Sequence, residues 1–508
     1  MSSPLHQAIS SLADPNSSAL VVFSDTTLVL PEAFQAWDLE LGGLVASVLA
    51  AGDFRGRADE CLLIYAPQLP VRRIALAGLG TPDRTNLEGL RRAAGIAARA
   101  LQEAEVTAAV YHLPTGLRAT REDGDAAPAD LAAAVGEGAR LAVFEFVRAS
   151  KALLEPKPRL TVFEWVGEPL HHAAHQAGWT RAAQIVTAID HARRLILRPG
   201  GDLTPAVFAD EASRLAGEAG LRVAVMDEQE LASRGFNGIV AIGRGSEQPP
   251  RLITLHHEGG EPGVPPIAIV GKGVTFDSGG IGIKPSRGME KMKYDMAGGA
   301  AALAIVLAAA YLRLPVNLVA VIPSVENMPS DRALCPNEVL TMYGGLTAEI
   351  NDTDAEGRVI LADALAYAAK DLGARAIVDM ATLTGAVAIA LGRTICGVMG
   401  TESAMTAALI RSGRLAGDPG WELPLNEPRF DDMVKSDIAD LVNYPGGEAS
   451  SITAASFMKP FTFGKPWVHL DIAGVGWSNK VDGYRIKGPT GAPIRMVLHW
   501  LQAGAPGA

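Results

Sequence analysis

The sequence predicts an α/β protein with two domains, a smaller N-terminal α/β domain and a larger C-terminal α/β domain built on a mixed central sheet. Its 508 residues exceed what one hydrophobic core usually organises. Short apolar runs alternate with helical stretches, which is typical of α/β folds. A helical stretch ends at Arg198-Pro-Gly-Gly201, where proline and glycine stop a helix. We therefore expect domains at 1–170 and 201–508, joined by a helical connector at 171–200.

The N-terminal part contains runs of strand length and one stretch with helical spacing of its apolar residues. The strand-like runs are Ala19 to Phe23, Ile74 to Ala77 and Ala108 to Tyr111, and the helical stretch is Leu87 to Ala104. Gly78-Leu-Gly80 follows the second run as a nucleotide-binding loop would, but the third glycine of that pattern is missing. An ordinary strand-to-helix turn is therefore the favoured interpretation.

The connector is the stretch from His171 to Leu197, which is rich in alanine, arginine and histidine. Beyond it, apolar runs again alternate with helical stretches, at Val223 to Val225, Ile267 to Val270, Val316 to Ile322, Ala376 to Val378 and Val468 to Leu470. This alternation predicts a large mixed sheet. The uncharged stretch Met296 to Leu312 approaches membrane-spanning length, but its alanine and glycine content predicts a buried helix of a soluble protein.

Composition narrows the compartment and the partners. The formal net charge of -11 argues against nucleic acid and against an anionic membrane surface as partners. Cys61, Cys335 and Cys396 are too few and too widely spaced for a disulfide framework. The first residues lack the basic start and apolar core of a secretory signal. We expect a cytoplasmic protein that does not associate with membranes.

Two segments concentrate chemically active side chains: Val270-Gly-Lys-Gly-Val-Thr-Phe-Asp-Ser-Gly-Gly280 and Asn351-Asp-Thr-Asp-Ala-Glu-Gly-Arg358. Lys272 follows an apolar run and Asp277 lies in a glycine-bordered loop, an arrangement that strand-end chemistry requires. Asp354, Glu356 and Arg358 are two residues apart, so on an extended backbone entering a helix their side chains would share one side.

These acids, with Asp295 before the helix that starts near Met296, suggest a metal centre. The alternatives are a solvated salt-bridge cluster and, for Asp295, a helix N-cap. Glycine-flanked loops in apolar surroundings favour the inward-facing site. Oxygen ligands without Cys or His favour Mg or Mn, and Zn also accepts a carboxylate pair. Two metals sharing a carboxylate would clamp a water between them.

Other catalytic motifs are missing from the sequence. It has no His-Glu-x-x-His, no Gly-x-Ser-x-Gly and no Walker lysine followed by Ser or Thr, which excludes zincins, serine hydrolases of the elbow type and P-loop enzymes. His256, His257 and His469 remain as conceivable ligands, although a lone histidine beside a strand is more often structural.

The C-terminal part closely resembles the leucyl aminopeptidases, also called cytosol aminopeptidases, of peptidase family M17. The resemblance extends over about Thr204 to Arg495 and rests on six ordered motifs: Val270-Gly-Lys-Gly, Phe276-Asp-Ser-Gly-Gly, Lys293-Tyr-Asp-Met-Ala-Gly-Gly-Ala, Thr353-Asp-Ala-Glu-Gly-Arg, Ala381-Thr-Leu-Thr-Gly-Ala and His469-Leu-Asp-Ile-Ala-Gly. The N-terminal part matches only in kind, as the variable, macro-like α/β domain of such enzymes.

The resemblance implies two divalent metal ions, Mn or Zn first and Mg or Co as alternatives. Lys272, Asp277, Asp295 and Glu356 would hold the tight ion, and Asp277, Asp354 and Glu356 the exchangeable one. A lysine amine can coordinate only when neutral, so the metal must displace its proton. A metal-bridging hydroxide would attack the first peptide carbonyl.

Further residues receive roles through the same resemblance. Lys284 would stay cationic and hydrogen-bond the scissile carbonyl, and Arg358 would anchor bicarbonate as the general base. Asp295 would also contact the substrate, as would the pocket and backbone residues Met292, Thr382, Leu383, Gly385 and Ala473. Their alternative role is ordinary core packing.

Departures from the family pattern leave substrate preference open. Asp352 stands where many members have Asn, and Gly476 lies at a pocket position that is larger in some relatives, which suggests a roomier pocket than leucine needs. The family also implies a homohexamer of two trimers acting on short peptides. Two alternatives stay open: a narrow dipeptidase, for example for cysteinylglycine, and an added DNA-binding role, which the net charge disfavours.

Overall fold

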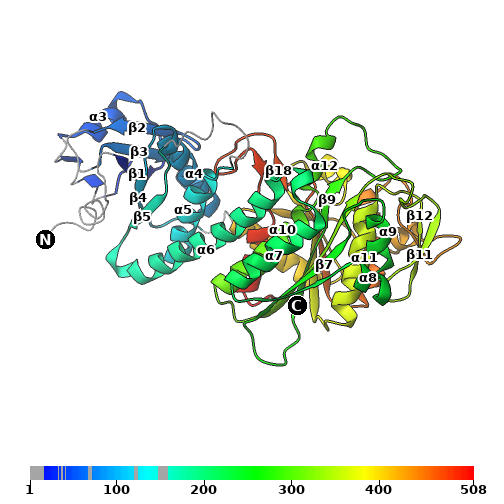
Figure 1. Cartoon of the computed structure of the whole chain (residues 1–508). Coiled ribbons are helices and arrows are strands. Elements are labelled where there is room, and N and C mark those ends of the chain that lie inside the picture. Colours follow the sequence, from blue (N-terminus) through cyan, green and yellow to red (C-terminus); the bar gives the residue numbers. More distant parts are fainter. Residues whose placement is uncertain are drawn as a thin grey trace. The chain divides into compact units, whose positions relative to one another are not determined.

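The computed structural model describes residues 17–31, 34–35, 38–39, 42–66, 71–118, 124–146 and 158–508 (Figure 1). The chain divides into two compact units. The first comprises Met1–Val186 with Asn479–Lys487, and the second comprises Thr187–Ser478 with Gly488–Ala508. The boundary falls inside helix α6 (His172–Leu197), which occupies most of the predicted connector.

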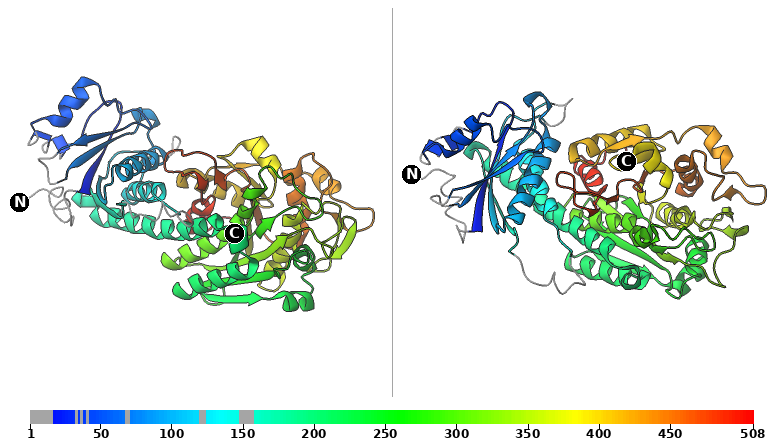
Figure 2. Two further views of the ribbon diagram at one scale, coloured as in Figure 1. Left: turned by 45° about the horizontal axis from the view of Figure 1, so that its top comes forward. Right: turned by 90° about the horizontal axis from the view of Figure 1, so that it is seen from above.

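The first unit is a five-stranded sheet in the order β2-β3-β1-β4-β5 with helices on both faces (Figure 2). Its elements are β1 (Ser18–Ser24), α3 (Leu44–Ala51), β2 (Cys61–Tyr65), β3 (Arg73–Gly78), η2 (Pro82–Arg84), α4 (Leu87–Glu103), β4 (Ala108–His112), α5 (Pro128–Ala142), β5 (Val162–Val166) and η4 (Pro169–His171). Strands β3, β1, β4 and β5 are parallel, and β2 is antiparallel at the edge.

A late segment of the chain, Asn479–Lys487, belongs to this first unit, which the sequence analysis did not anticipate. Asp482 forms an ion pair with Arg92 of α4, in which Asp482 Oδ1 lies 2.8 Å from Arg92 Nη2. Tyr484 is 2% exposed and lies against Gly95. A Cβ added at Gly95 would lie only 2.5 Å from the Cβ of Tyr484. Such contacts join residues hundreds of positions apart, so local sequence patterns carry no signal for them.

The second unit begins with the helices and strands that precede the predicted site. These are η5 (Gly200–Asp202), α7 (Pro205–Glu218), β6 (Arg222–Met226), α8 (Glu228–Arg234), α9 (Asn237–Gly243), β7 (Arg251–Glu258), β8 (Ile267–Gly271), β9 (Gly273–Asp277), η6 (Met289–Tyr294), α10 (Ala297–Tyr311) and β10 (Asn317–Asn327). The remainder comprises β11 (Glu338–Thr341), β12 (Thr347–Ile350), α11 (Glu356–Lys370), β13 (Ala376–Ala381), α12 (Gly385–Leu391), β14 (Cys396–Gly400), α13 (Ser403–Ala416), β15 (Gly420–Glu422), α14 (Pro428–Met433), β16 (Leu441–Val442), α15 (Ser450–Met458), η7 (Lys459–Thr462), β17 (Trp467–Asp471), β18 (Trp477–Ser478), β19 (Gly488–Pro489) and α16 (Ile494–Gln502).

The main sheet of this unit runs β15-β14-β17-β13-β8-β10-β7-β6, with β9 paired to β10. Strands β17, β13, β8 and β10 are parallel in the centre, whereas β14 pairs antiparallel with β17 and β7 with β10. The predicted mixed sheet is therefore confirmed. Parallel central strands need cover on both faces, and α10 and α11 lie on opposite faces of this sheet (Figure 1).

The sequence located the main elements correctly. Every predicted strand and helix named above overlaps an observed one, including α4 and α6. Helix α10 is buried along its length, as expected for Met296 to Leu312. Among the described residues, one helical span, Met289–Tyr311, is long and apolar enough to cross a membrane, and most of it is buried inside the fold. Burial of this kind is typical of the core helix of a soluble protein.

Helix α11 anchors the core beneath the site. Its residues Val359 to Ala369 pack against Ala268 and Val270 of β8 in one buried cluster. Asp363, fully buried in this helix, accepts hydrogen bonds from the backbone N–H groups of Ile239 (3.0 Å) and Tyr343 (2.8 Å). Those bonds hold the loops around α11, because unpaired buried N–H groups are costly.

Candidate metal centre and active site

The predicted site lies at the carboxyl edge of the central parallel strands. Lys272 directly follows β8 and Thr382 directly follows β13, while Asp471 is the last residue of β17. Strand β13 lies between β8 and β17 and is parallel to both, so the carboxyl ends of the three strands meet at one edge of the sheet. Asp277 ends β9, which pairs parallel with β10 next to them.

The second motif enters the site from the start of α11. Helix α11 begins at Glu356, and Asp354 lies in the turn before it. The prediction of an extended backbone through Arg358 is therefore wrong: in a helix, residues two apart point about 200° apart, so Glu356 and Arg358 face different sides. Gly357 is needed here because a Cβ would lie 2.7 Å from Lys272 Cε.

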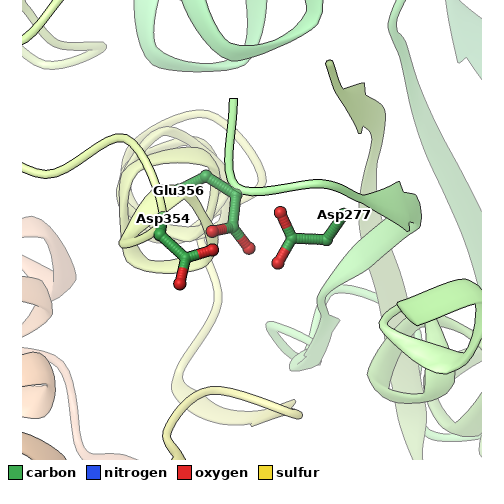
Figure 3. A group of neighbouring side chains, drawn as sticks. All are labelled: Asp277, Asp354 and Glu356. Carbon is green, nitrogen blue, oxygen red and sulfur yellow. The ribbon is translucent and has the colours of Figure 1, made fainter. Parts of the chain in front are cut away.

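Three carboxylates lie close together although the backbone is helical from Glu356 onward. One oxygen each from Asp277, Asp354 and Glu356 lies within 4.8 Å of the others (Figure 3). Asp277 and Glu356 are 2% and 1% exposed, so two of the three charges are withdrawn from water. Such a cluster needs cations, because burying unpaired carboxylates is unfavourable.

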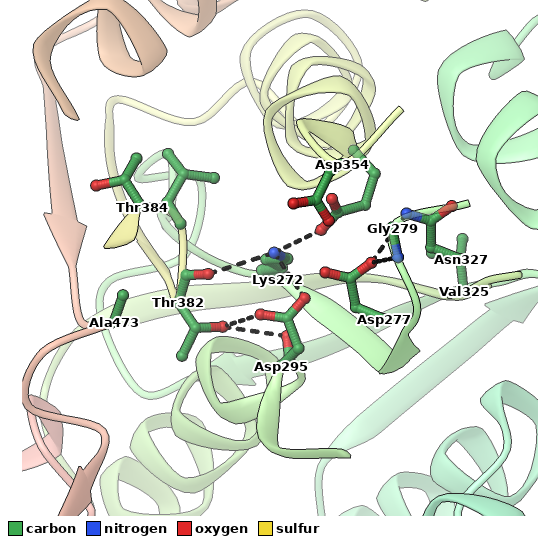
Figure 4. Close-up of polar contacts among 12 residues, drawn as sticks. Lys272, Asp277, Gly279, Asp295, Val325, Asn327, Asp354, Thr382, Thr384 and Ala473 are labelled. Carbon is green, nitrogen blue, oxygen red and sulfur yellow. Dashed lines mark hydrogen bonds and ion pairs between the residues drawn. The ribbon is translucent and has the colours of Figure 1, made fainter. Parts of the chain in front are cut away.

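Lys272 supplies one cation. Its Nζ lies 2.7 Å from Asp295 Oδ2 and 2.7 Å from Glu356 Oε1, and it donates to the carbonyl of Thr382 at 3.3 Å (Figure 4). Burial lowers the pKa of this amine, but Asp295 and Glu356 more than reverse the effect, so its pKa lies above the ordinary value. The lysine is therefore charged when only these side chains surround it.

Lys284 supplies the second cation. Its Nζ lies 2.7 Å from Asp277 Oδ2 and also contacts Asp354 Oδ1. Burial lowers the pKa of Lys284, whereas Asp277, Glu356 and Asp354 together raise it above the ordinary value. The side chain is 20% exposed, so unlike Lys272 it can meet a molecule that arrives from solvent.

The site carries an excess of negative charge. Four carboxylates, those of Asp277, Asp295, Asp354 and Glu356, face two ammonium groups, so with every group ionised the site would carry two more negative than positive charges. Burial raises the pKa of Asp277, and neighbouring Glu356 raises it further. Burial and Asp277 likewise raise the pKa of Asp354 to about 7. Unfavourable carboxylate packing of this kind is relieved by divalent cations.

The residues fit a metal centre by a second criterion. Asp295 Oδ2, Asp354 Oδ1 and Glu356 Oε1 are buried, and the partner of each in the described structure is a single lysine amine, which leaves the oxygen room for a second partner. Carboxylate oxygens with free acceptor capacity are the ligands that divalent cations prefer. Asp277, in contrast, is oriented by Gly279 N–H and Asn327 Nδ2, both 2.9 Å from its Oδ1.

Asp295 does not act as the cap of α10. That helix begins at Ala297, and Met296 holds the cap position without a side-chain bond. Asp295 instead accepts a hydrogen bond from Thr382 Oγ1 at 2.6 Å and contacts Lys272. Its pKa is raised well above the ordinary value, first by burial, and Lys272 only partly offsets this.

Arg358 lies buried on a different side of α11. It is 4% exposed, and its Nη1 donates to the carbonyl of Asn443 at 2.9 Å. Its Nε makes no hydrogen bond in the described structure, so the guanidinium keeps donor capacity for an anion. Burial lowers the pKa of Arg358 to about 10, with Glu356 and Asp352 opposing the shift.

The structure reveals two organising residues to which the sequence analysis gave no role. Asp471 Oδ1 accepts from the N–H groups of Leu383 (3.3 Å) and Ala473 (3.2 Å), and its Oδ2 accepts from Thr384 Oγ1 (2.6 Å). Asn327 holds Asp277 in place from the end of β10. A polar residue at the end of an apolar run, the signal that identified Lys272, marks both positions in the sequence, but their roles depend on strand neighbours that the local pattern does not give.

The predicted substrate-binding residues differ in burial and in their contacts with the site. Thr382 is buried and hydrogen-bonded to Asp295 (Figure 4). The backbone N–H groups of Leu383 and Ala473 both donate to Asp471. Met292 lies in η6, and Gly385 is the exposed first residue of α12 with open space around its Cα. Because the Leu383 N–H already donates to Asp471, a peptide would have to use other backbone groups there.

His469 is a structural residue. It is completely buried, and its Nδ1 lies 2.7 Å from Asp379 Oδ1, whose other oxygen accepts from Trp467 Nε1 at 2.7 Å. His257 is also engaged, through its Nε2 and the carbonyl of Leu314 at 2.9 Å. Histidines therefore do not complete the carboxylate cluster among the described residues.

Comparison with known proteins agrees with this geometry. The "Cytosol aminopeptidase family, catalytic domain" profile matches residues 190–498, and the corresponding N-terminal domain profile matches residues 20–151. A probable cytosol aminopeptidase of Roseiflexus castenholzii is 39% identical over 92% of this chain and 96% of its own length. A probable cytosol aminopeptidase of Syntrophotalea carbinolica is 40% identical over 92% of this chain and 93% of its own length.

Solved structures give the same result. The cytosol aminopeptidase of Coxiella burnetii matches with a TM-score of 0.77 and 30% identity, covering 96% of this chain and 97% of its own. The bottromycin maturation enzyme BotP in complex with Mn matches with a TM-score of 0.81 and 30% identity, over 96% and 99%. A variant of tomato leucine aminopeptidase matches with a TM-score of 0.82 and 28% identity, covering 96% of this chain and 94% of its own.

Fold, site and matches define a class: the protein is a hydrolase, a peptidase of the aminopeptidase type. The chain belongs to the cytosol aminopeptidase family, whose members are metal-dependent.

Proposed function

We propose that the protein is a dinuclear metal-dependent aminopeptidase that removes the N-terminal residue from short peptides. The observation that carries the proposal is the convergence of Asp277, Asp354 and Glu356 oxygens within 4.8 Å, next to Asp295 and Lys272. Lys272, Asp277, Asp295 and Glu356 would hold one ion, and Asp277, Asp354 and Glu356 the other, so Asp277 and Glu356 would belong to both sets of ligands. Mn and Zn are the proposed metals, with Mg and Co as alternatives.

When bound, the two ions would lower the pKa of a water and polarise the peptide carbonyl. The chain's own residues would then do the positioning. Lys272 must lose its proton to become a ligand, and the cation that replaces the proton also takes over the neutralisation of Asp295 and Glu356. Lys284, freed from Asp277 and Asp354, would direct its charge toward the reacting carbonyl oxygen.

Arg358 would hold a bicarbonate ion that serves as the general base. Support comes from its buried guanidinium with an Nε that makes no hydrogen bond in the described structure. A planar guanidinium binds planar oxyanions through paired N–H groups. Held by Arg358, bicarbonate would supply general-base chemistry beside the reacting carbonyl, and the role of Arg358 would be to bind and orient that anion.

The pocket for the first side chain would be formed by Met292, Thr382, Gly385 and Ala473, with backbone groups from the Leu383 loop holding the peptide. Gly476 adds room, because a Cβ there would lie 3.7 Å from Thr382 Cγ2. We therefore propose acceptance of leucine and other, often apolar, N-terminal residues. A panel of dipeptides and amino-acid amides separates this broad activity from a narrow dipeptidase.

The decisive experiment combines metal analysis with a peptide assay. Protein purified without added metal is reconstituted with Mn, Zn, Co or Mg and assayed on a dipeptide and its N-acetyl derivative. The proposal expects two ions per chain in the active form and cleavage of the free-amine peptide only. Full activity after exhaustive chelation, or equal cleavage of the blocked peptide, would contradict it.

Metal affinity is expected to rise with pH through neutrality. Asp354 has a pKa near 7, so below that pH a proton occupies the oxygen that the exchangeable ion needs. The apparent dissociation constant for Mn²⁺, measured by calorimetry, should increase by about tenfold for each pH unit below 7 at this position. Asp354→Asn should bind more weakly and lose that dependence. An unchanged constant between pH 8 and pH 6 in the wild type would refute the prediction.

Arg358→Lys is expected to lose most activity although it keeps the positive charge. A lysine cannot form the paired N–H bonds that hold a planar bicarbonate. Carbonate-depleted buffer should slow the wild type and added bicarbonate should restore it, whereas the variant should respond little; turnover is the measurement. Equal bicarbonate dependence in both proteins, or none in the wild type, returns Arg358 to a structural role as the partner of Asn443.

We also propose a cytoplasmic homohexamer of two trimers. Enclosing the sites in an internal cavity would admit short peptides and exclude folded proteins. Light scattering at micromolar concentration is expected to give about six times the 53.1 kDa chain mass. A monomer under those conditions would remove the assembly from the proposal while leaving the metal centre untouched.

A further inference from the structure

A cavity lies in the first unit, and none of the peptidase-site residues lines it. Its volume is about 820 Å³, within the range of small-molecule sites. Its walls come from the carboxyl ends of four parallel strands: Ser24 ends β1, Leu79 follows β3, His112 ends β4 and Val166 ends β5. The peptidase reaction uses none of these residues, and the sequence analysis left the Gly78-Leu-Gly80 turn without a function.

The position is the one at which open α/β sheets bind ligands. The chain leaves β1 through α3 and β2 to reach β3 on one side, and then returns through α4 to β4 on the other side. Val45 of α3 packs with Leu20 and Val22 of β1, whereas α4 packs with α5 on the opposite face (Figure 2). Crossovers that leave on opposite faces open a crevice beside β1 at the carboxyl edge.

The walls of the cavity are held in place by hydrogen bonds between the strand-end loops. Leu79 N–H donates to the Ser24 carbonyl at 2.9 Å, and Thr26 N–H donates to the Gly80 carbonyl at 3.0 Å. On the other side, Leu113 N–H donates to the Val166 carbonyl at 2.8 Å. These bonds tie β1 to β3 and β4 to β5 at their ends, so the cavity is formed before a ligand arrives.

The lining selects the chemistry of the ligand. Phe23, Leu79, Leu113 and Val166 make much of the wall apolar, which suits a ring. Asp25 is the fixed polar anchor, since its Oδ1 accepts from Thr27 N–H at 2.8 Å and from Thr27 Oγ1 at 2.5 Å.

The charges of the lining favour uncharged ligands over phosphorylated ones. Glu168 adds a second carboxylate, and the described lining residues include neither lysine nor arginine. Burial lowers the pKa of His112, so this imidazole is neutral at pH 7 and supplies no positive charge. Glu168 has His171 as a neighbour, with 3.6 Å between Oε2 and Nε2, whereas Asp25 has no lysine or arginine partner in the described lining. A carboxylate such as Asp25 accepts hydrogen bonds from hydroxyl or amino groups and repels phosphates.

We propose that this cavity binds an uncharged nucleoside or a ring compound of the same size and donor pattern, with its hydroxyl groups on the Asp25 carboxylate and its ring between the apolar walls. The inference is independent of the peptidase proposal. It assigns the first unit a ligand site of its own, which recognises donors on a sugar-like group and rejects the phosphorylated counterparts.

The test is calorimetric titration of the full-length protein with adenosine, guanosine, cytidine and uridine, and with their 5′-monophosphates. At least one nucleoside is expected to bind with a dissociation constant of about 1 mM or tighter, and its monophosphate at least about tenfold more weakly. Binding of none of the nucleosides, or tighter binding of a monophosphate than of its nucleoside, overturns the proposal.

Variants locate the binding site. Val29 lines the cavity with its side chain 69% exposed, so Val29→Trp can fill the mouth without disturbing the core, and it should abolish binding. Val162→Trp, on an exposed position of β5 outside the lining, is the matched control and should bind like the wild type. Asp25→Asn should weaken binding by about tenfold or more. Glu356→Ala should leave nucleoside binding unchanged, which separates this site from the metal centre. Binding that survives both Val29→Trp and Asp25→Asn places the nucleoside elsewhere and overturns the assignment.

Discussion

Replacement of Asp277 or Glu356 by alanine is expected to abolish peptidase activity, with a loss of at least about a thousandfold in turnover. Each carboxylate is proposed to contribute to both ions, and each is already almost fully buried beside its partner. Removing either would leave Lys272 or Lys284 without a principal counter-charge and open a gap between the two ion positions. Metal content should fall in parallel with activity.

An exposed acid on the surface provides a matched control for this experiment. Asp432→Ala removes an acid whose side chain is 66% exposed and which forms an ion pair with exposed Lys435, so it should leave both metal content and turnover unchanged. Circular dichroism should show that Asp277→Ala and Glu356→Ala remain folded. Retention of two ions and near-normal turnover by either variant would falsify the bridging assignment.

Lys284→Ala is expected to lower turnover by about a hundredfold or more while metal content stays intact. The loss should appear in kcat more than in KM, because the charge is needed where the carbonyl oxygen becomes negative in the transition state. Lys435→Ala, which removes an exposed amine of a surface ion pair, is the matched control.

The structure offers a rival role for Lys284 that the same experiment separates. Its Nζ contacts Asp277 and Asp354, so it could serve only to neutralise these carboxylates before the ions bind. In that case Lys284→Ala would bind the exchangeable ion more tightly and keep its turnover. A loss of turnover without loss of metal supports the transition-state role, and tighter metal binding at normal turnover rejects it.

Much of the site could be predicted because its residues carry local signals. Lys272 follows a strand, as its apolar run predicts, whereas Asp277, predicted to lie in a glycine-bordered loop, ends strand β9. The small-residue helix after Asp295 and the apolar helix after Glu356 are equally visible in the spacing of their side chains.

The errors and omissions arose where the partner is distant in sequence. Asp471 connects the loops after β13 and β17, and that role depends on those strands being neighbours in the sheet. Asn327 orients Asp277 only because β9 pairs with β10. The extended backbone assumed for Asp354 to Arg358 failed because α11 starts at Glu356, one turn earlier than the apolar pattern alone indicates.

The sequence by itself determined the fold class, the main elements and the set of acids and lysines, because apolar periodicity and strand-end chemistry are properties of neighbouring residues. Tertiary structure alone decided which oxygens lie within 4.8 Å of each other, that Arg358 points away from them toward Asn443, and that Asn479–Lys487 completes the first unit. The physical reason is that these features depend on strand order and on packing between segments far apart in the chain, which no local pattern encodes.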